Sequence, residues 1–198
     1  PEIRSRFDDN AAAMRVPTAQ FRPVLAAARA TLRSAGLDTT ALSWTERVLW
    51  FDRNKPGCAD FDVDAMVSGF AQAVRALPGV LRADIVSELA KADTTQDVIA
   101  RRWMRMFLPG VESYPGQRAL VTVTLQPFFY LGQGADASHG TPFDYDAHVP
   151  LAFLGPQFKK GHQSVKVNVV DLAPTLAAVL GIRPLERLDG RILKEALR

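Results

Sequence analysis

The sequence predicts an α/β protein in which helices flank a layered sheet. Three observations favour this class: helical periodicity in several stretches, short apolar or β-branched runs between them, and glycine or proline at most junctions. The chain has 198 residues, 47% of them hydrophobic and 23% charged, which is ordinary for a soluble folded protein. No internal repeat or linker-like tract divides the sequence, so we expect residues 1–198 to form a single domain.

The helices are expected where apolar residues recur at steps of three and four between a capping residue and a stop. They are 21–35, ended by Gly36; 65–77, capped by Asp62 and ended by Pro78-Gly79; 98–107, capped by Thr94 or Thr95 and ended by Pro109-Gly110; and 172–180, capped by Asp171, with Pro174 in its first turn and Gly181 at its end. Strands are expected at 48–51, 80–87, 120–125, 148–155 and 165–170.

Charge and composition argue against several partners. The net charge of +3 is spread along the chain, and the densest basic cluster, Arg101, Arg102 and Arg105, is interpreted as a solvated helix face rather than a nucleic-acid site. No apolar run approaches the roughly 18 residues of a membrane helix. The single cysteine, Cys58, forms no intrachain disulfide and has no basic neighbour that would activate it. The chain opens at Pro1 without a signal peptide, which suggests a processed or truncated chain.

The sequence contains no self-contained active site. It has no glycine-rich phosphate loop, no nucleophile-elbow serine and no His-Glu-x-x-His motif, so we assign no catalytic and no cofactor-binding residue. The segment 136–148 concentrates candidate metal ligands, with His139 followed by Gly140, which lets the backbone pass close to an ion. Composition alone favours a polar surface loop instead, in which Asp and Thr side chains cap turns. The candidates are Asp136, His139, Asp144, Asp146 and His148.

The longer pattern at 138–155, Ser-His-Gly-Thr-Pro-Phe-Asp-Tyr-Asp-Ala-His-Val-Pro-Leu-Ala-Phe-Leu-Gly, resembles the C-terminal signature of bacterial phosphate-irrepressible alkaline phosphatases. These enzymes belong to the alkaline phosphatase superfamily, close to its nucleotide pyrophosphatase/phosphodiesterase branch. Residues 169–182 resemble the helix that follows in that family, and 189–193 its closing turn. The resemblance is strongest over 132–193. The Asp-Leu-Ala-Pro-Thr start of the helix recurs in sulfatases and phosphoglycerate mutases, so it discriminates less.

The resemblance implies an alkaline-phosphatase-like layered sheet and a two-zinc site that hydrolyses small phosphate esters through a phospho-enzyme. It makes His139 a zinc ligand, with its acidic neighbours at most orienting the imidazole. His148 is expected to support the loop, and His162 has no assigned role. The family also implies a periplasmic or secreted protein, with neither nucleic acid nor membrane as a partner.

The chain departs from the family because the nucleophile and the other metal ligands lie upstream of this segment in relatives, and the sequence contains none of those motifs. We therefore expect a C-terminal fragment that binds zinc weakly, is inactive alone and dimerises through exposed sheet edges. The alternatives are a fragment of a phosphodiesterase or sulfatase of the superfamily, and a non-catalytic binding or structural module that retains the fold. A regulatory α/β domain that binds an anion is a weaker third reading.

Overall fold

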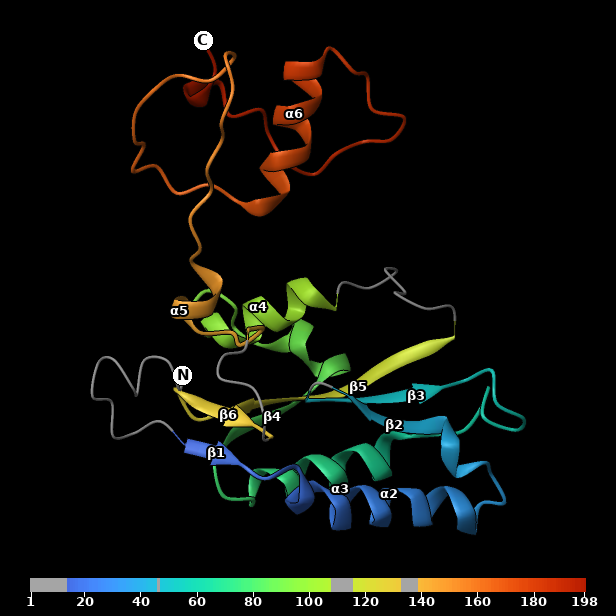
Figure 1. Ribbon diagram of the computed structural model, residues 1–198. Coiled ribbons are helices and arrows are strands. Elements are labelled where there is room, and N and C mark those ends of the chain that lie inside the picture. The colour runs from blue at the N-terminus through green and yellow to red at the C-terminus, as the bar shows by residue number, and fades with distance from the viewer. Residues whose placement is uncertain (1–13, 46, 108–115, 133–138) are drawn as a thin grey trace. The chain divides into compact units, whose positions relative to one another are not determined.

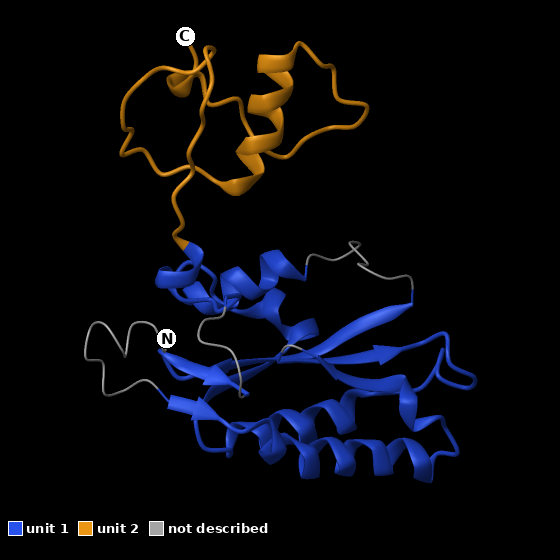
Figure 2. Cartoon of the chain, in the orientation of Figure 1, with its two compact units in different colours: residues 1–147 blue, residues 148–198 orange. Residues whose placement is uncertain are grey.

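The computed structural model describes residues 14–45, 47–107, 116–132 and 139–198. The chain divides into two compact units, residues 1–147 and residues 148–198, drawn in blue and orange in Figure 2. Each unit is described by itself. The expectation that 1–198 form a single domain stays a prediction.

The larger unit is built on a four-stranded antiparallel sheet in the order β2-β3-β5-β4 (Figure 1). Its strands are β2 (Leu42–Thr45), β3 (Val48–Asp52), β4 (Val80–Ile85) and β5 (Gln117–Leu125). The central strand is β5, where Val121 pairs with Leu49 on one side and Ile85 on the other. The strands expected at 48–51, 80–87 and 120–125 are confirmed. Dimerisation through the edge strands β2 and β4 stays a prediction.

Helices α2 (Arg22–Ser34) and α3 (Asp64–Arg75) cover one face of this sheet (Figure 1). Each helix presents an apolar stripe to the sheet, and Leu32 and Val74 are completely buried there. Burying one such side chain stabilises the fold by about 1.5–3 kcal/mol. Both helices were expected. The predicted cap of the second is wrong, because Val63 occupies the N-cap position and makes no side-chain cap bond, while Asp62 lies one residue earlier and accepts a hydrogen bond from the backbone N–H of Asp64 at 2.9 Å.

The other face of the sheet is covered by α4 (Val98–Met106) (Figure 1). The indole N–H of Trp103 donates to the hydroxyl of Thr124 in β5 at 2.8 Å, and both side chains are buried. Because β5 is covered on both faces, its residues 119–125 are all buried, which explains their unbroken run of apolar and β-branched side chains.

The predicted cap of this helix is wrong. Asp97 caps α4 by accepting from the N–H of Ala100 at 2.9 Å, whereas Thr95 belongs to a preceding turn in which its own N–H donates to Asp93 at 3.0 Å. The expected helix end at Pro109-Gly110 lies outside the described residues.

Two short strands form a separate parallel pair in the larger unit. They are β1 (Met14–Val16) and β6 (Phe129–Leu131), with Arg15 opposite Tyr130. Neither was expected, because three residues are too few to show a period. The remaining short elements of this unit are η1 (Thr18–Phe21), η2 (Thr39–Ala41), η3 (Val86–Lys91) and α5 (Asp144–Ala147).

The smaller unit contains the helix α6 (Leu172–Leu180), preceded by η4 (Val169–Asp171) and followed near the end of the chain by η5 (Lys194–Ala196). The helix was expected, and Gly181 ends it with a left-handed φ of +65°. The strands expected at 148–155 and 165–170 are wrong. The one β-bridge recorded for this unit joins Phe158 to Leu197, so these two segments lack the paired neighbour that a strand requires.

Candidate functional site

The candidate metal ligand His139 lies on the surface of the larger unit, in the segment that leads into α5. Its side chain is exposed, and the following Gly140 has a φ of +83°, in the left-handed region that glycine adopts without strain. The Nη2 of Arg47 donates to the carbonyl oxygens of both residues, at 3.4 Å for His139 and 2.9 Å for Gly140. A guanidinium therefore holds the backbone that carries the imidazole.

Arg47 is itself tied to the central strand. It lies between β2 and β3 with a φ of +74°, which is uncommon for a residue with a side chain. Its carbonyl oxygen accepts a hydrogen bond from the N–H of Val123 in β5 at 2.9 Å. The backbone at 139–140 is thus linked through one residue to the most buried strand of the sheet, which gives a candidate ligand a rigid support.

The carboxylates near His139 are engaged in shaping the loop. Asp146 accepts hydrogen bonds from the N–H and the hydroxyl of Thr141. Asp144 pairs with Arg102 of α4, whose Nη1 also donates to the carbonyl oxygen of Pro142 at 2.6 Å. Both carboxylates therefore bond to Thr141 and Arg102, and their expected role in orienting the imidazole stays a prediction.

An aromatic cluster fastens the same segment to the turn before β6. The ring of Tyr145 stacks on Phe128 and on Phe143, with ring centroids 5.0 Å and 5.4 Å apart. The hydroxyl of Tyr145 accepts from the N–H of Phe128 at 3.0 Å, and Phe128 has a positive φ of 66°. Residues 139–147 are therefore held from three directions, by Arg47, Arg102 and Phe128.

The donor set does not fit a complete zinc site. Across the described ranges, no group of three or more His, Cys, Asp or Glu side chains is placed to hold a metal ion. A catalytic zinc needs about three protein ligands, and His139 offers one imidazole. His148 and His162 are exposed and belong to the smaller unit, and Asp136 lies outside the described residues. No catalytic step through zinc follows from these residues alone.

The motif residues of the smaller unit have structural roles. The pKa of the Asp171 carboxyl is lowered because the backbone N–H groups of Arg191 and Asn168 donate to it, each at 2.9 Å. The buried hydroxyl of Thr175 donates to the carbonyl oxygen of Asp171 at 2.7 Å and accepts from the N–H of Leu193 at 3.0 Å. The two segments of the family resemblance, 169–182 and 189–193, therefore lock together at the start of α6.

The contacts correct one interpretation of the sequence and agree with another. The reading of the arginine cluster as a solvated face is wrong for Arg102, which holds the loop, and for Arg101, which donates to the carbonyl oxygen of Thr94 at 3.1 Å. Arg105 is exposed. Burial raises the pKa of the Cys58 thiol, and the nearby carboxylates add to the effect, which makes this side chain a poor nucleophile.

Arg47 and Arg102 are the residues that sequence reasoning missed. They contact the loop from 93 and 40 positions away, and neither belongs to a motif. The one signal in the sequence is the cluster of arginines at 101–105.

The fold matches part of one solved enzyme structure closely. The wild-type alkaline phosphatase PafA superposes with a TM-score of 0.71 over 96% of this chain and 35% of that chain, at 16% sequence identity. A substituted variant of PafA gives a TM-score of 0.72 over 98% of this chain and 35% of that chain, at 17% identity. The class is therefore a mixed α/β protein that corresponds to about a third of an alkaline phosphatase fold.

Sequence relatives point the same way over shorter stretches. The chain is 40% identical over 75 residues to alkaline phosphatase PhoD of Zymomonas mobilis, and 38% identical over 61 residues to alkaline phosphatase PhoK of a Sphingomonas species. These matches cover 37% and 30% of this chain. A calcium-transporting ATPase of Myroides odoratus is 26% identical over 141 residues, or 70% of this chain. No protein-family model matches the sequence.

The chain is related to the alkaline phosphatase superfamily over part of its length, as the sequence pattern predicted. It spans 24% of the Myroides relative, 12% of PhoD and 11% of PhoK. No helix among the described residues has both the length and the apolar character to cross a membrane.

Proposed function

We propose that this chain is the C-terminal portion of a metal-dependent phosphate-ester hydrolase, and that His139 is one of its zinc ligands. The observation that carries the proposal is the identity of 40% with PhoD and 38% with PhoK, two proteins named as alkaline phosphatases. The fixed backbone at 139–140 supports it, because a metal ligand has to be held in place before the ion binds.

In this proposal the chain contributes one imidazole and the frame that holds it. Arg47 fixes the backbone at 139–140, and Arg102 and Tyr145 hold the loop beyond it. The nucleophile and the other ligands come from outside residues 1–198, so the isolated chain is inactive. The zinc ions, when bound, would polarise phosphoryl oxygens and activate the nucleophile.

The substrate class follows from the relatives and is part of the proposal. A small phosphate monoester is the first choice, because PhoD and PhoK are named phosphatases. The name of the Myroides relative adds ATP, a phosphoanhydride, as a second substrate to test. A phosphodiesterase, a sulfatase and a non-catalytic module that keeps the fold are the rivals. A periplasmic or secreted location belongs to the same proposal.

Hydrolysis assays test this function directly. The 198-residue chain and the protein encoded by the complete reading frame around it are compared on p-nitrophenyl phosphate, bis-p-nitrophenyl phosphate, p-nitrophenyl sulfate and ATP. We expect the complete protein to hydrolyse the monoester and to lose activity with a chelator, and the 198-residue chain to be inert. Turnover by the short chain would show that it contains a nucleophile, and a complete protein that hydrolyses none of the four would favour the module.

Zinc titration of the short chain adds an independent check. One imidazole cannot supply the affinity of three or four ligands, so calorimetry should show binding weaker than about micromolar. A sub-micromolar dissociation constant would mean that residues 1–198 hold a site of their own, contrary to the proposal.

A further inference from the structure

The smaller unit leaves most of its large apolar side chains uncovered. Of the fifteen exposed large hydrophobic residues among the described residues, eleven lie in 148–198, although this unit has 51 of the 170 described residues. Leu154 and Leu185 are as exposed as in an extended chain, at 101% and 105%. In this unit Leu193 is the one large aliphatic side chain that is buried, with an exposed fraction of 3%. Scattered exposed apolar residues are ordinary, but this concentration marks an interaction surface.

The helix α6 and the short η4 before it carry four of these eleven residues. Its sequence from Leu172 to Leu180 has no charged residue, and its one polar side chain, Thr175, is buried against the closing turn. Leu176 and Leu180 lie one turn apart on α6, and Val169 lies in η4 just before it; their exposed fractions are 37%, 66% and 71%. We call these three residues the α6 stripe. A helix that is apolar all round belongs in a protein interior.

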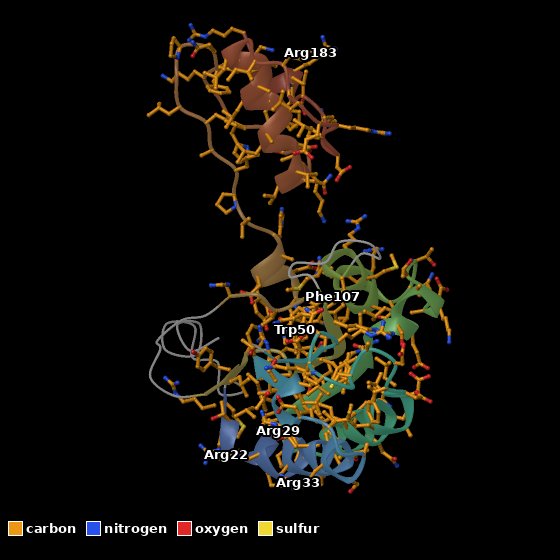
Figure 3. All side chains as sticks on the ribbon, turned by 90° about the vertical axis from the view of Figure 1, so that its right-hand side faces the viewer. Arg22, Arg29, Arg33, Trp50, Phe107 and Arg183 are labelled. Atoms are coloured by element: carbon orange, nitrogen blue, oxygen red, sulfur yellow. The ribbon has the colours of Figure 1, made fainter. Side chains whose placement is uncertain are left out.

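Helix α2 of the larger unit provides the internal comparison. It buries Ala28 and Leu32 on one side and carries Arg22 and Arg33 at exposed positions outside that stripe (Figure 3). Such an amphipathic helix packs one face against the core and exposes the other to solvent. Helix α6 has no charged face, so it does not have the pattern of a helix that is exposed to solvent. For the same reason it does not have the polar face of a helix that lies on a membrane surface.

Two possible partners for this apolar surface, the larger unit and a second copy of the chain, fit it poorly. The larger unit has four exposed large apolar residues in its described part, namely Met14, Leu81, Val98 and Met106, which is little surface to meet eleven. A second copy would bring together two units of like net charge, because residues 148–198 contain eight Lys and Arg and four Asp and Glu.

The remaining part of the matching fold is a better candidate partner for this surface. This chain, including its smaller unit, superposes over 96% of its length on PafA but spans 35% of that enzyme. The fold is therefore completed by about twice as much chain as is present in residues 1–198. We propose that the α6 stripe and its apolar neighbours form the interface with that remaining part of an alkaline phosphatase fold, which presents an apolar surface to them. The inference rests on the proposed function only through the family relationship.

Thiol labelling tests the interface, because the single native cysteine, Cys58, is fully buried and leaves a silent background. Leu180→Cys places a reporter in the stripe, and Arg33→Cys places a matched reporter on the charged face of α2. Each variant is made in the 198-residue chain and in the protein encoded by the complete reading frame, and the rate of maleimide labelling is measured at several protein concentrations.

We expect Leu180→Cys to label as fast as Arg33→Cys in the 198-residue chain at every concentration, and at least about tenfold more slowly in the complete protein, where labelling has to wait for local opening. Arg33→Cys should label at the same rate in both. Slow labelling of Leu180→Cys in the short chain would mean that the larger unit covers the stripe, and slowing with concentration would mean that a second copy does.

Slow labelling in the short chain, or slowing with protein concentration, would overturn the proposal. Fast labelling of Leu180→Cys in the complete protein would overturn it as well, and so would protection that requires added lipid vesicles. A control variant, Leu180→Lys, should leave the unfolding of the short chain unchanged, because the side chain it replaces is uncovered. The readout is labelling and not catalysis, so a complete protein without hydrolase activity could still show the protected stripe, and the two proposals fail separately.

Discussion

Arg102 of α4 donates a hydrogen bond at 2.6 Å to the carbonyl oxygen of Pro142, three residues after the candidate ligand His139. The same guanidinium pairs with Asp144, which is largely exposed. Through these contacts the helix that covers one face of the sheet also fixes the loop that presents the imidazole. An arginine can do this because its planar fork reaches two acceptors at once.

Replacing Arg102 should loosen this loop without unfolding the larger unit. Arg102→Ala removes the bond to Pro142 and the exposed ion pair, and we expect the free energy of opening residues 139–147 to fall by about 0.5–2 kcal/mol. Hydrogen exchange of the Thr141 amide, which donates to Asp146, should accelerate accordingly. Arg105→Ala, at an exposed position of the same helix, is the control. Equal exchange rates in both variants would show that Arg102 does not hold the loop.

Removing the hydroxyl of Thr175 should weaken the closing turn of the smaller unit. Thr175→Val keeps the shape of the side chain but leaves the buried N–H of Leu193 without its acceptor, at a cost of about 1–3 kcal/mol. The Leu193 amide should exchange faster by about one to two orders of magnitude. Thr175→Ser retains the hydroxyl and should keep most of the protection. A Val variant that exchanges like the Ser variant would contradict the role of this bond.

The pair formed by Arg191 and Glu195 should give the smaller unit an acid dependence. The side chain of Arg191 donates to both carboxylate oxygens, which lowers the pKa of Glu195 to about 2. Because the folded pKa lies below that of the unfolded chain, the pair stabilises the fold above about pH 4.5, and this contribution disappears as the pH falls towards about 2.

A carbon-detected NMR titration of the Glu195 carboxyl measures this pKa. We expect a midpoint near 2 in the native chain and a return to the ordinary range in Arg191→Gln. A midpoint near 4.5 in the native chain would show that the pair does not persist in solution.

The sequence predicted the elements whose signal is local. The helices at 22–34, 64–75 and 172–180 have long stretches with a regular period, and the strand at 117–125 has an unbroken apolar run. The strands expected at 148–155 and 165–170 failed because β-branched residues such as Val165 and Val170 form a strand only beside a partner strand. The same residues are now explained as exposed apolar surface of the smaller unit.

The family relationship could be predicted from the sequence, whereas the role of His139 as a zinc ligand stays a prediction. The pattern around His139 identified the superfamily, since a run of specific residues carries that information without a structure. Arg47 and Arg102 could not be found, because their role depends on contacts between segments that are far apart in the sequence. The sequence indicated that Asp171 and Thr175 lie at the start of a helix. Their hydrogen bonds to Arg191 and Leu193 depend on the tertiary structure and could not be predicted from it.

The central claim is that His139 is a zinc ligand of a phosphate-ester hydrolase whose other ligands lie outside this chain. Its most direct test is the zinc content of the protein encoded by the complete reading frame, compared between the native protein, His139→Ala and His148→Ala after dialysis against a weak chelator. The account predicts that His139→Ala loses bound zinc and p-nitrophenyl phosphate turnover together, while His148→Ala keeps both. Full zinc content and activity in His139→Ala would contradict it.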